Sequence, residues 1–293
     1  MARPISGYAL VLASAVLLGT LGMFSRLFYD EGGEPFALLL LRFTGIGSIL
    51  LVLAVARGGR RPARPVALFA LALGALQLGT AYALFEGFAR APVGLVVLLF
   101  YVYPLIVTVG AARFFREALG ARRVAVLVIG LAGVALAVGV PHSATALGIM
   151  LGLAAGVFVA ALVLSARHLM VSHALTPLWL TALMFVSPAP ALGVVAAIRG
   201  VELGVGAAGW AAAVGAMVVS GVVPIVLFYT GVKLVGAATA SLLGIAEPFA
   251  GVLLGYAVLG ESLARLQLVG GALILGAVAL LGVEGLRRPV EAR

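Results

Sequence analysis

The side chains of this sequence that could do chemistry are few, and several lie within long apolar runs of the kind that span membranes. Glu86 and Glu247 are the carboxylates in such positions, and Arg42 is the one cation. An ionised group at that depth costs roughly 2.5–3.5 kcal/mol, so it is usually paired, hydrated or functional. Two roles are therefore open for Glu247: packing with a hydrogen bond to backbone groups freed by Pro248, or binding of a substrate ammonium group or a proton. Glu86 lies near the end of its run, where water could hydrate it, and no sequence argument pairs Arg42 with either acid.

Polar and aromatic side chains in the same runs supply what a small-molecule site needs, because such sites are mostly apolar with a few convergent polar groups. Successive helical residues turn by about 100°, so Gln77 and Tyr82 point about 140° apart, and some of these side chains must face neighbouring helices. For each tyrosine, a hydrogen bond between helices is the alternative to a place in a cavity. The predicted substrate cavity is lined by Gln77, Tyr82, Glu86, Tyr101, Tyr103, Phe158, Trp179, Ser220, Tyr229 and Glu247.

The chain has few residues that could form disulfides, bind a metal ion or catalyse a reaction. It has no cysteine, which excludes disulfides and thiolate ligands, and its three histidines form no H-E-x-x-H pattern. Its single aspartate is Asp30, and no G-x-S-x-G sequence is present, so neither an aspartate pair nor a serine nucleophile supports an enzyme. We therefore expect no catalytic residues, no metal site and no cofactor.

The composition of the chain places these residues in a membrane. Of its 293 residues 64% are hydrophobic and 10% are charged, whereas soluble proteins have about 45–50% and about 25%. The net charge of +9 does not indicate nucleic acid as a partner, because the charges lie in short gaps between apolar runs. Since a helix needs about 20 apolar residues to cross a bilayer, the sequence predicts ten membrane-spanning helices, at 6–28, 36–56, 65–89, 93–114, 121–140, 144–166, 176–198, 207–233, 237–259 and 264–285.

The positive charges also predict how these helices are oriented. With ten spans both termini lie on one side of the membrane, and that side receives fourteen basic residues against four on the other. Lysine and arginine accumulate in cytoplasmic loops, so both termini are predicted to be cytoplasmic. The expected fold class is an all-α polytopic membrane protein.

The two halves of the sequence resemble each other at a nearly constant offset. Five-helix halves, residues 1–143 and 144–293, enter the membrane from opposite sides because five is odd. Such inverted repeats are typical of secondary transporters, in which two halves rock about a midplane site. Pro104 and Pro248, each near the middle of its span, are predicted to be hinges, with a static bend as the alternative. The recurring residues are Tyr103-Pro104-Leu105 with Arg116-Glu117 and Glu247-Pro248-Phe249 with Gly260-Glu261, then Arg26 with Arg167, Pro35 with Pro177 and Phe43 with Phe185.

These features resemble the EamA-type members of the drug/metabolite transporter superfamily. The resemblance rests on the inverted repeat, on Glu247-Pro248-Phe249, and on Glu117 and Glu261 after the two kinked helices. The first repeat departs from the pattern at Tyr103 and Arg116. The resemblance implies a multi-pass protein of the bacterial inner membrane that exports small metabolites, and exporters of aromatic and other amino acids are a prominent branch.

The predicted function is therefore secondary transport that exports small organic metabolites, amino acids first among them, by alternating access through a cavity between the repeats. The alternatives are a broad-range drug or nucleoside permease and a uniporter without proton coupling. A channel would be expected to show polar rings or filters, and an intramembrane enzyme finds no suitable residues. The expected partners are a small-molecule substrate and the lipid bilayer, and the sequence leaves open whether a proton is coupled.

Overall fold

Helices make up all of the regular secondary structure in the part of the chain that the computed structural model describes, which is residues 2–58, 61–88, 90, 91, 93–117, 120–138, 145–201, 203–260 and 264–287. Ten helical stretches there are long and apolar enough to cross a membrane, which confirms the predicted number. Their bounds lie within a few residues of the predicted ones, except that the sixth continues to Ser172. They are Ser6–Asp30, Pro35–Ala56, Arg64–Gly87, Leu95–Phe115, Ala121–Val138, Ala146–Ser172, Pro177–Arg199, Ala207–Val235, Ala237–Val258 and Arg265–Val283.

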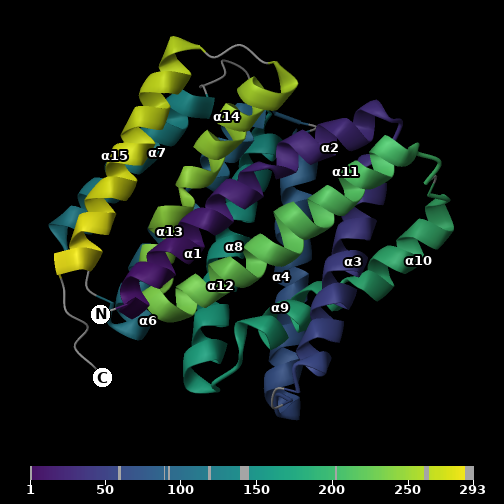
Figure 1. The fold of residues 1–293 in the computed structure, drawn as a ribbon, viewed down its shortest axis with the longest axis horizontal. Helices are drawn as coiled ribbons and strands as arrows, with labels where there is room; N and C mark the ends of the chain where they lie inside the picture. Colours follow the sequence, from purple (N-terminus) through teal and green to yellow (C-terminus); the bar gives the residue numbers. More distant parts are fainter. Residues whose placement is uncertain are drawn as a thin grey trace.

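The first five spans consist of seven helices (Figure 1). The first span is divided at Thr20, and the fourth is interrupted at Tyr101 and Val102. These helices are α1 (Ala2–Gly19), α2 (Leu21–Asp30), α3 (Pro35–Ala56), α4 (Arg64–Phe88), α5 (Val93–Phe100), α6 (Tyr103–Phe115) and α7 (Ala121–Val138).

The last five spans are divided at other places. The seventh is interrupted at Ser187 and Pro188, the eighth contains the π-helical turn η1, and the ninth is interrupted at Ile245. The helices are α8 (Ala146–Ser172), α9 (Pro177–Val186), α10 (Ala189–Arg199), α11 (Ala207–Met217), η1 (Val218–Val222), α12 (Val223–Val235), α13 (Ala237–Gly244), α14 (Ala246–Leu259) and α15 (Arg265–Arg287).

Local sequence explains where several helices begin. The helices α3 and α9 start on Pro35 and Pro177, whose fixed φ and missing N–H suit the first helical position. Threonine side chains cap α8 and α9, because Thr145 accepts a hydrogen bond from the Gly148 N–H at 3.1 Å, and Thr176 makes the equivalent bond at 3.3 Å. These caps satisfy N–H groups that have no partner within the helix.

The structure keeps the register of the sequence repeat. The short helices α5 and α13 have eight residues each and begin 144 residues apart, at Val93 and Ala237. The helices α7 and α15 also begin 144 residues apart, at Ala121 and Arg265. The predicted boundary between the repeats, at residues 143 and 144, lies outside the described residues.

Helices of the two halves pack against each other rather than forming two separate bundles. The most extensive contacts join α7 to α15, α4 to α8, α1 to α12 and α3 to α9, one helix from each half in every pair. Figure 1 shows α7 beside α15 at one edge of the molecule, and the start of α1 and the end of α15 at the same end. Phe43 and Phe185, equivalent residues of α3 and α9, stack with ring centroids 5.3 Å apart. The two halves are therefore interlocked.

Apolar side chains cover much of the outside of the bundle as well as its interior. Ile198 is 80% exposed, Phe114 69% and Val52 67%. Extensive exposed apolar surface marks contact with a partner or a membrane, and ten spans identify the covering medium as lipid.

Small residues bring α8 close to α5 just before the interruption of the fourth span. A Cβ atom on Gly152 would lie 3.0 Å from the Leu99 Cβ, and one on Gly156 would lie 2.9 Å from the Phe100 carbonyl oxygen. Glycines spaced in this way allow membrane helices to approach closely. The end of α5 is thereby held against a continuous helix of the other repeat.

Candidate functional site

Two interrupted helices meet inside the bundle. The helix α5 gives way to α6 at Tyr101, and α13 gives way to α14 at Ile245. Pro104 and Pro248 lie in the first turns of α6 and α14, and proline cannot donate the hydrogen bond that would continue the preceding helix. Since α6 packs against α13, the two interruptions face each other.

Aromatic side chains fill the space between these interruptions. Tyr103 is 5% exposed, and a Cβ atom on Gly244 would lie 2.7 Å from its hydroxyl oxygen. The Tyr103 ring centroid lies 5.2 Å from that of Phe100 and 5.8 Å from that of Tyr101. Gly244 therefore leaves the room that the tyrosine needs, and the last residue of α13 touches the first residue of α6.

Glu247 lies in the first turn of α14, where residues of the first repeat surround it. The Tyr101 hydroxyl is within hydrogen-bonding reach of the Glu247 carboxyl group. The Arg42 guanidinium interacts electrostatically with the Tyr29 hydroxyl first and with that carboxyl group second. Arg42 and Glu247 do not form a direct ion pair within the described part of the chain. The intramembrane cation and the central intramembrane acid thus belong to one site.

Arg42 reaches this site from α3 and contacts a distortion of the eighth span. Its Nη2 donates a hydrogen bond to the Ser220 carbonyl oxygen at 3.4 Å. That carbonyl lies in η1, four residues before Pro224, which has no N–H to offer it. The Arg42 Nε is buried and finds no hydrogen-bond partner in the described structure. The guanidinium therefore keeps donor capacity that the protein itself does not use.

Hydroxyl groups of the first span hold η1 in place. Thr20 Oγ1 and Ser220 Oγ lie 2.6 Å apart, and Ser14 Oγ donates to the Pro224 carbonyl oxygen at 2.7 Å. Ser14 and Ser220 are both fully buried. These hydrogen bonds fix the position of the carbonyl that receives Arg42.

We define the central polar cluster as Arg42, Tyr101, Ser220 and Glu247. It contains three of the predicted lining residues, and Tyr103 lies beside it. Arg42 was not among the predicted lining residues. The cost of an unpaired charge in a membrane signalled that it needs a partner, but only the fold shows which one.

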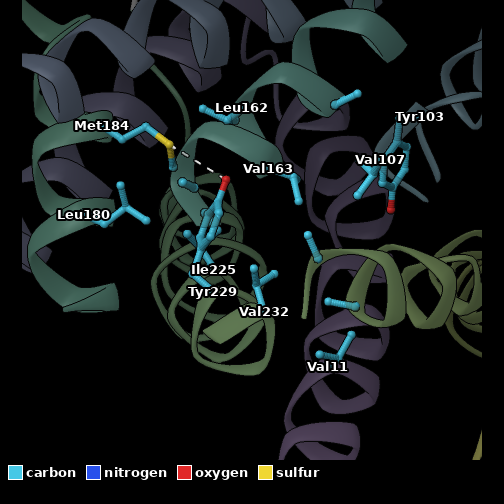
Figure 2. Close-up of a cluster of buried hydrophobic side chains, with 14 of the residues drawn as sticks. Val11, Tyr103, Val107, Leu162, Val163, Leu180, Met184, Ile225, Tyr229 and Val232 are labelled. Carbon is cyan, nitrogen blue, oxygen red and sulfur yellow. Dashed lines mark hydrogen bonds between the residues drawn. The ribbon is translucent and has the colours of Figure 1, made fainter. Parts of the chain in front are cut away.

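Three other predicted residues are aromatic side chains in packed surroundings. Figure 2 shows the Tyr229 hydroxyl directed at the Met184 sulfur atom, 3.9 Å away. Trp179 is buried in α9, and its indole Nε1 has no hydrogen-bond partner among the described residues. Phe158 of α8 lies against Gly79 of α4, where a Cβ atom would be 3.2 Å from its ring.

The remaining predicted residues lie along α4. Tyr82 is 60% exposed and Gln77 is half-buried. Glu86 forms an ion pair with Arg90 at the end of this helix, and its side chain is 33% exposed. The placement of these three residues in a cavity stays a prediction.

A second constellation holds the turn between α12 and α13. The Glu117 carboxylate accepts hydrogen bonds from the backbone N–H groups of Ala237 at 3.0 Å and Ala238 at 3.2 Å. A carboxylate at this place also interacts favourably with the positive end of the helix dipole. Glu117 of the first repeat therefore caps α13 of the second, a role that its sequence position had not shown. Its counterpart Glu261 lies outside the described residues.

Arg167 completes this constellation from α8. Its Nη1 donates to the carbonyl oxygens of Val232 at 3.1 Å and Lys233 at 2.9 Å, at the end of α12. Its Nε lies 3.8 Å from Glu117 Oε1. The turn itself passes through Gly236, whose φ of 89° suits glycine alone, and a Cβ atom there would lie 2.7 Å from the Glu117 carboxylate.

Within the described residues, no group of three or more His, Cys, Asp or Glu side chains could hold a metal ion. Comparison of the sequence with known proteins shows which family the chain is similar to. A model of the EamA-like transporter family matches residues 5–139 and again residues 146–283. An uncharacterized transporter of Archaeoglobus fulgidus is 30% identical over 275 residues, which cover 94% of this chain and 95% of the relative.

A solved structure agrees with this fold. A protein of 20% sequence identity has a crystal structure that superposes with a TM-score of 0.82 and covers 95% of this chain and 99% of its own. At that identity the likeness concerns the fold. The two family matches, one in each half, confirm the resemblance and fit the repeat of five and five helices. The chain belongs to the EamA-like transporter family and is a multi-pass membrane protein for secondary transport of small molecules.

Proposed function

We propose that this transporter exports amino acids, aromatic and other neutral ones, by alternating access through the centre of the bundle. The observation that carries the proposal is the position of Glu247. Its carboxyl group is held beside Tyr101 at the point where the interrupted helices of the two repeats meet, with the rings of Phe100 and Tyr103 close by. A carboxylate binds a substrate ammonium group, and aromatic rings accommodate an apolar or aromatic side chain.

The interruptions before Pro104 and Pro248 support alternating access. Discontinuous helices at equivalent places of two inverted repeats form the substrate site of several secondary transporters. Each break is followed by a proline, so the backbone hydrogen bonds are already interrupted there. The flanking segments can therefore change their relative angle without breaking further hydrogen bonds. Rocking of the repeats about these breaks would open the centre to one side of the membrane and then to the other.

Counterflow in proteoliposomes tests the proposal. The purified full chain is reconstituted and the vesicles are loaded with one unlabelled amino acid at a time. Uptake of the labelled compound should then be faster than into empty vesicles for at least one aromatic or aliphatic amino acid, and Glu247→Ala should abolish this stimulation. Stimulation by nucleosides or cationic drugs, with none by any amino acid, would contradict the proposed substrate class.

Proton coupling through Glu247 is tested with Glu247→Gln, which retains the shape of the side chain without its charge. If the carboxyl group carries a proton, exchange by the parent protein should depend on pH and exchange by the variant should not. An unchanged pH dependence in an active Glu247→Gln variant would exclude proton coupling through this residue.

We place the protein in the inner membrane of a bacterial cell with both termini cytoplasmic. The accessibility of tags at the two termini would check this orientation.

A further inference from the structure

We propose that Arg42 binds the carboxylate of the transported amino acid while Glu247 binds its ammonium group, so that each repeat supplies one of the two charges that recognise the zwitterion. This assignment rests on the proposed amino-acid transport and adds a binding group that neither the repeat nor the interrupted helices indicate. Arg42 belongs to α3 in the first half, and Glu247 belongs to α14 in the second. A bound zwitterion would therefore connect the two halves.

The donor groups of Arg42 are arranged for an anion. One Nη2 hydrogen bond reaches the Ser220 carbonyl at 3.4 Å, which is long for such a bond, and the Nε is buried without a partner in the described structure. A buried donor without a partner is costly, and a guanidinium fork matches a carboxylate in a bidentate way. A carboxylate that accepted from Nε and Nη would satisfy the Nε, for which the described part of the protein supplies no acceptor, and would add to the one long bond of Nη2.

Glu247 lies at the right place for the other end of the same molecule. A Cβ atom on Gly19 would lie 3.0 Å from the Glu247 carbonyl oxygen, and the next residue, Thr20, contacts Ser220, whose carbonyl oxygen receives Arg42. Arg42 and Glu247 themselves form no ion pair among the described residues. The α-amino and α-carboxyl groups of an amino acid are attached to one carbon atom, so a single molecule can present both to an anion and a cation of the same site. The Tyr101 hydroxyl is within hydrogen-bonding reach of the Glu247 carboxyl group. A carboxylate has about four acceptor positions, so one such bond leaves others available.

The backbone around Ser220 keeps this geometry in place. The distortion at η1 is braced by Thr20, and Pro224 is braced by Ser14. A π-helical turn inside a longer helix frequently marks a functional site. Here it directs a carbonyl oxygen at Arg42, which orients the guanidinium before a ligand arrives.

Charge balance follows from this assignment. With Glu247 ionised, Arg42 and Glu247 together carry one positive and one negative charge, and a zwitterionic substrate adds none. An analogue that lacks either charged group would leave one buried charge of the protein without a partner, which a membrane environment penalises strongly. Analogues with only one charge should therefore bind much more weakly than the amino acid.

The test uses L-phenylalanine as the probe, in counterflow with the reconstituted full chain. Three competitors separate the charges: 3-phenylpropionate lacks the ammonium group, 2-phenylethylamine lacks the carboxylate, and phenylalaninamide has a neutral amide in its place. For the parent protein, each competitor should inhibit at least about tenfold less well than phenylalanine, because each loses a charged hydrogen-bonding pair. Equal inhibition by phenylalaninamide and phenylalanine would overturn the assignment of Arg42 without any variant.

Three variants then test which residue binds each charged group of phenylalanine: Arg42→Gln, Arg42→Lys and Glu247→Gln. Arg42→Gln should raise the half-saturating phenylalanine concentration at least about tenfold, whereas 2-phenylethylamine should inhibit as well as before or better, because no arginine is left without a partner when it binds. Likewise Glu247→Gln should weaken phenylalanine, whereas 3-phenylpropionate should inhibit as well as before or better. Arg42→Lys keeps the charge and should retain part of the affinity for phenylalanine. It replaces Arg42→Gln in the test if the Gln variant does not fold. Arg113→Gln, an exposed arginine in the last turn of α6, is the matched control.

The outcomes separate the two proposals. If the parent protein exchanges phenylalanine but Arg42→Gln weakens phenylalanine and 2-phenylethylamine by the same factor, Arg42 has a structural role and its assignment is overturned, while amino-acid transport stands. If no amino acid is exchanged by the parent protein, the proposed function fails first. Opposite selectivity changes in the two variants would support the assignment.

Discussion

Removing the carboxylate of Glu117 should loosen the turn between α12 and α13 and destabilise the bundle. The side chain of Glu117 is 14% exposed and that of Arg167 is 18% exposed, so water replaces their partners poorly. Glu117→Ala loses two hydrogen bonds from backbone N–H groups to a charged acceptor, each worth about 1.5–3 kcal/mol. The ion pair with Arg167 at 3.8 Å is long, and we expect it to contribute under about 1 kcal/mol. The free energy of unfolding should fall by about 3–5 kcal/mol.

Glu117→Gln gives an internal scale for this loss. The amide keeps one acceptor oxygen, but its NH₂ group faces a backbone N–H that it cannot accept from, so about half of the effect, roughly 1.5–2.5 kcal/mol, should remain. Glu34→Gln is the matched control. Glu34 is exposed, and although it precedes α3 its side chain makes no capping hydrogen bond. Its substitution should leave stability unchanged.

The measurement is thermal unfolding of the purified protein in detergent, followed by the monodisperse fraction after heating. A change of 1 kcal/mol corresponds to about 2–4 °C for chains of this size, so Glu117→Ala should lower the Tm by about 6 °C or more and Glu117→Gln by about half as much. An Ala variant that melts within 2 °C of the parent, on the same scale, would refute the capping role. Combining Glu117→Ala with Arg167→Gln should cost less than the sum of the two, because residues that share a network are not additive.

Four further substitutions probe the backbone. Arg116 has a φ of 55° at the end of α6, so Arg116→Gly should relieve about 1 kcal/mol and raise the Tm by about 2–4 °C in the same assay. Gly244→Ala should cost about 1–3 kcal/mol because the added carbon meets the Tyr103 hydroxyl, and Tyr103→Phe in the same chain should restore much of the loss. Pro104→Ala and Pro248→Ala should each slow counterflow severalfold, and normal initial rates in both would exclude a hinge role.

The architecture could be predicted from the sequence because its signals are long and repeated. Runs of about 20 apolar residues admit one structure in a bilayer, so ten spans followed directly. The repeat was readable because Pro104 and Pro248 interrupt equivalent helices at equivalent places. Each of these signals is carried by the sequence itself and needs no knowledge of contacts between helices, so the structure confirms the ten spans. It adds shifted bounds and the breaks at Thr20, Ser187 and the π-helical turn.

The site could be predicted only in part, because its contacts join distant segments. Glu247 stands out as an acid in mid-span, and Ser220 as a polar residue in an apolar run. The contact of Arg42 with the Ser220 carbonyl depends on the π-helical turn before Pro224, and no periodicity signals such a turn. Likewise the sequence places Glu117 in a loop, and only the fold shows that its carboxylate lies at the start of α13.

The charged residues of the centre occupy the positions at which the repeats differ. At the offset that relates Pro35 to Pro177, Arg42 corresponds to Met184, and at the offset that relates the two prolines of the interrupted helices, Glu247 corresponds to Tyr103. A perfectly symmetric pair of repeats would present the same group from both sides, which suits a substrate with two identical ends. A zwitterion has two different ends, so a site for it must depart from the symmetry of its scaffold. The resemblance between the halves therefore predicts the fold and the place of the site. The residues that differ between the halves indicate the chemistry of the proposed substrate.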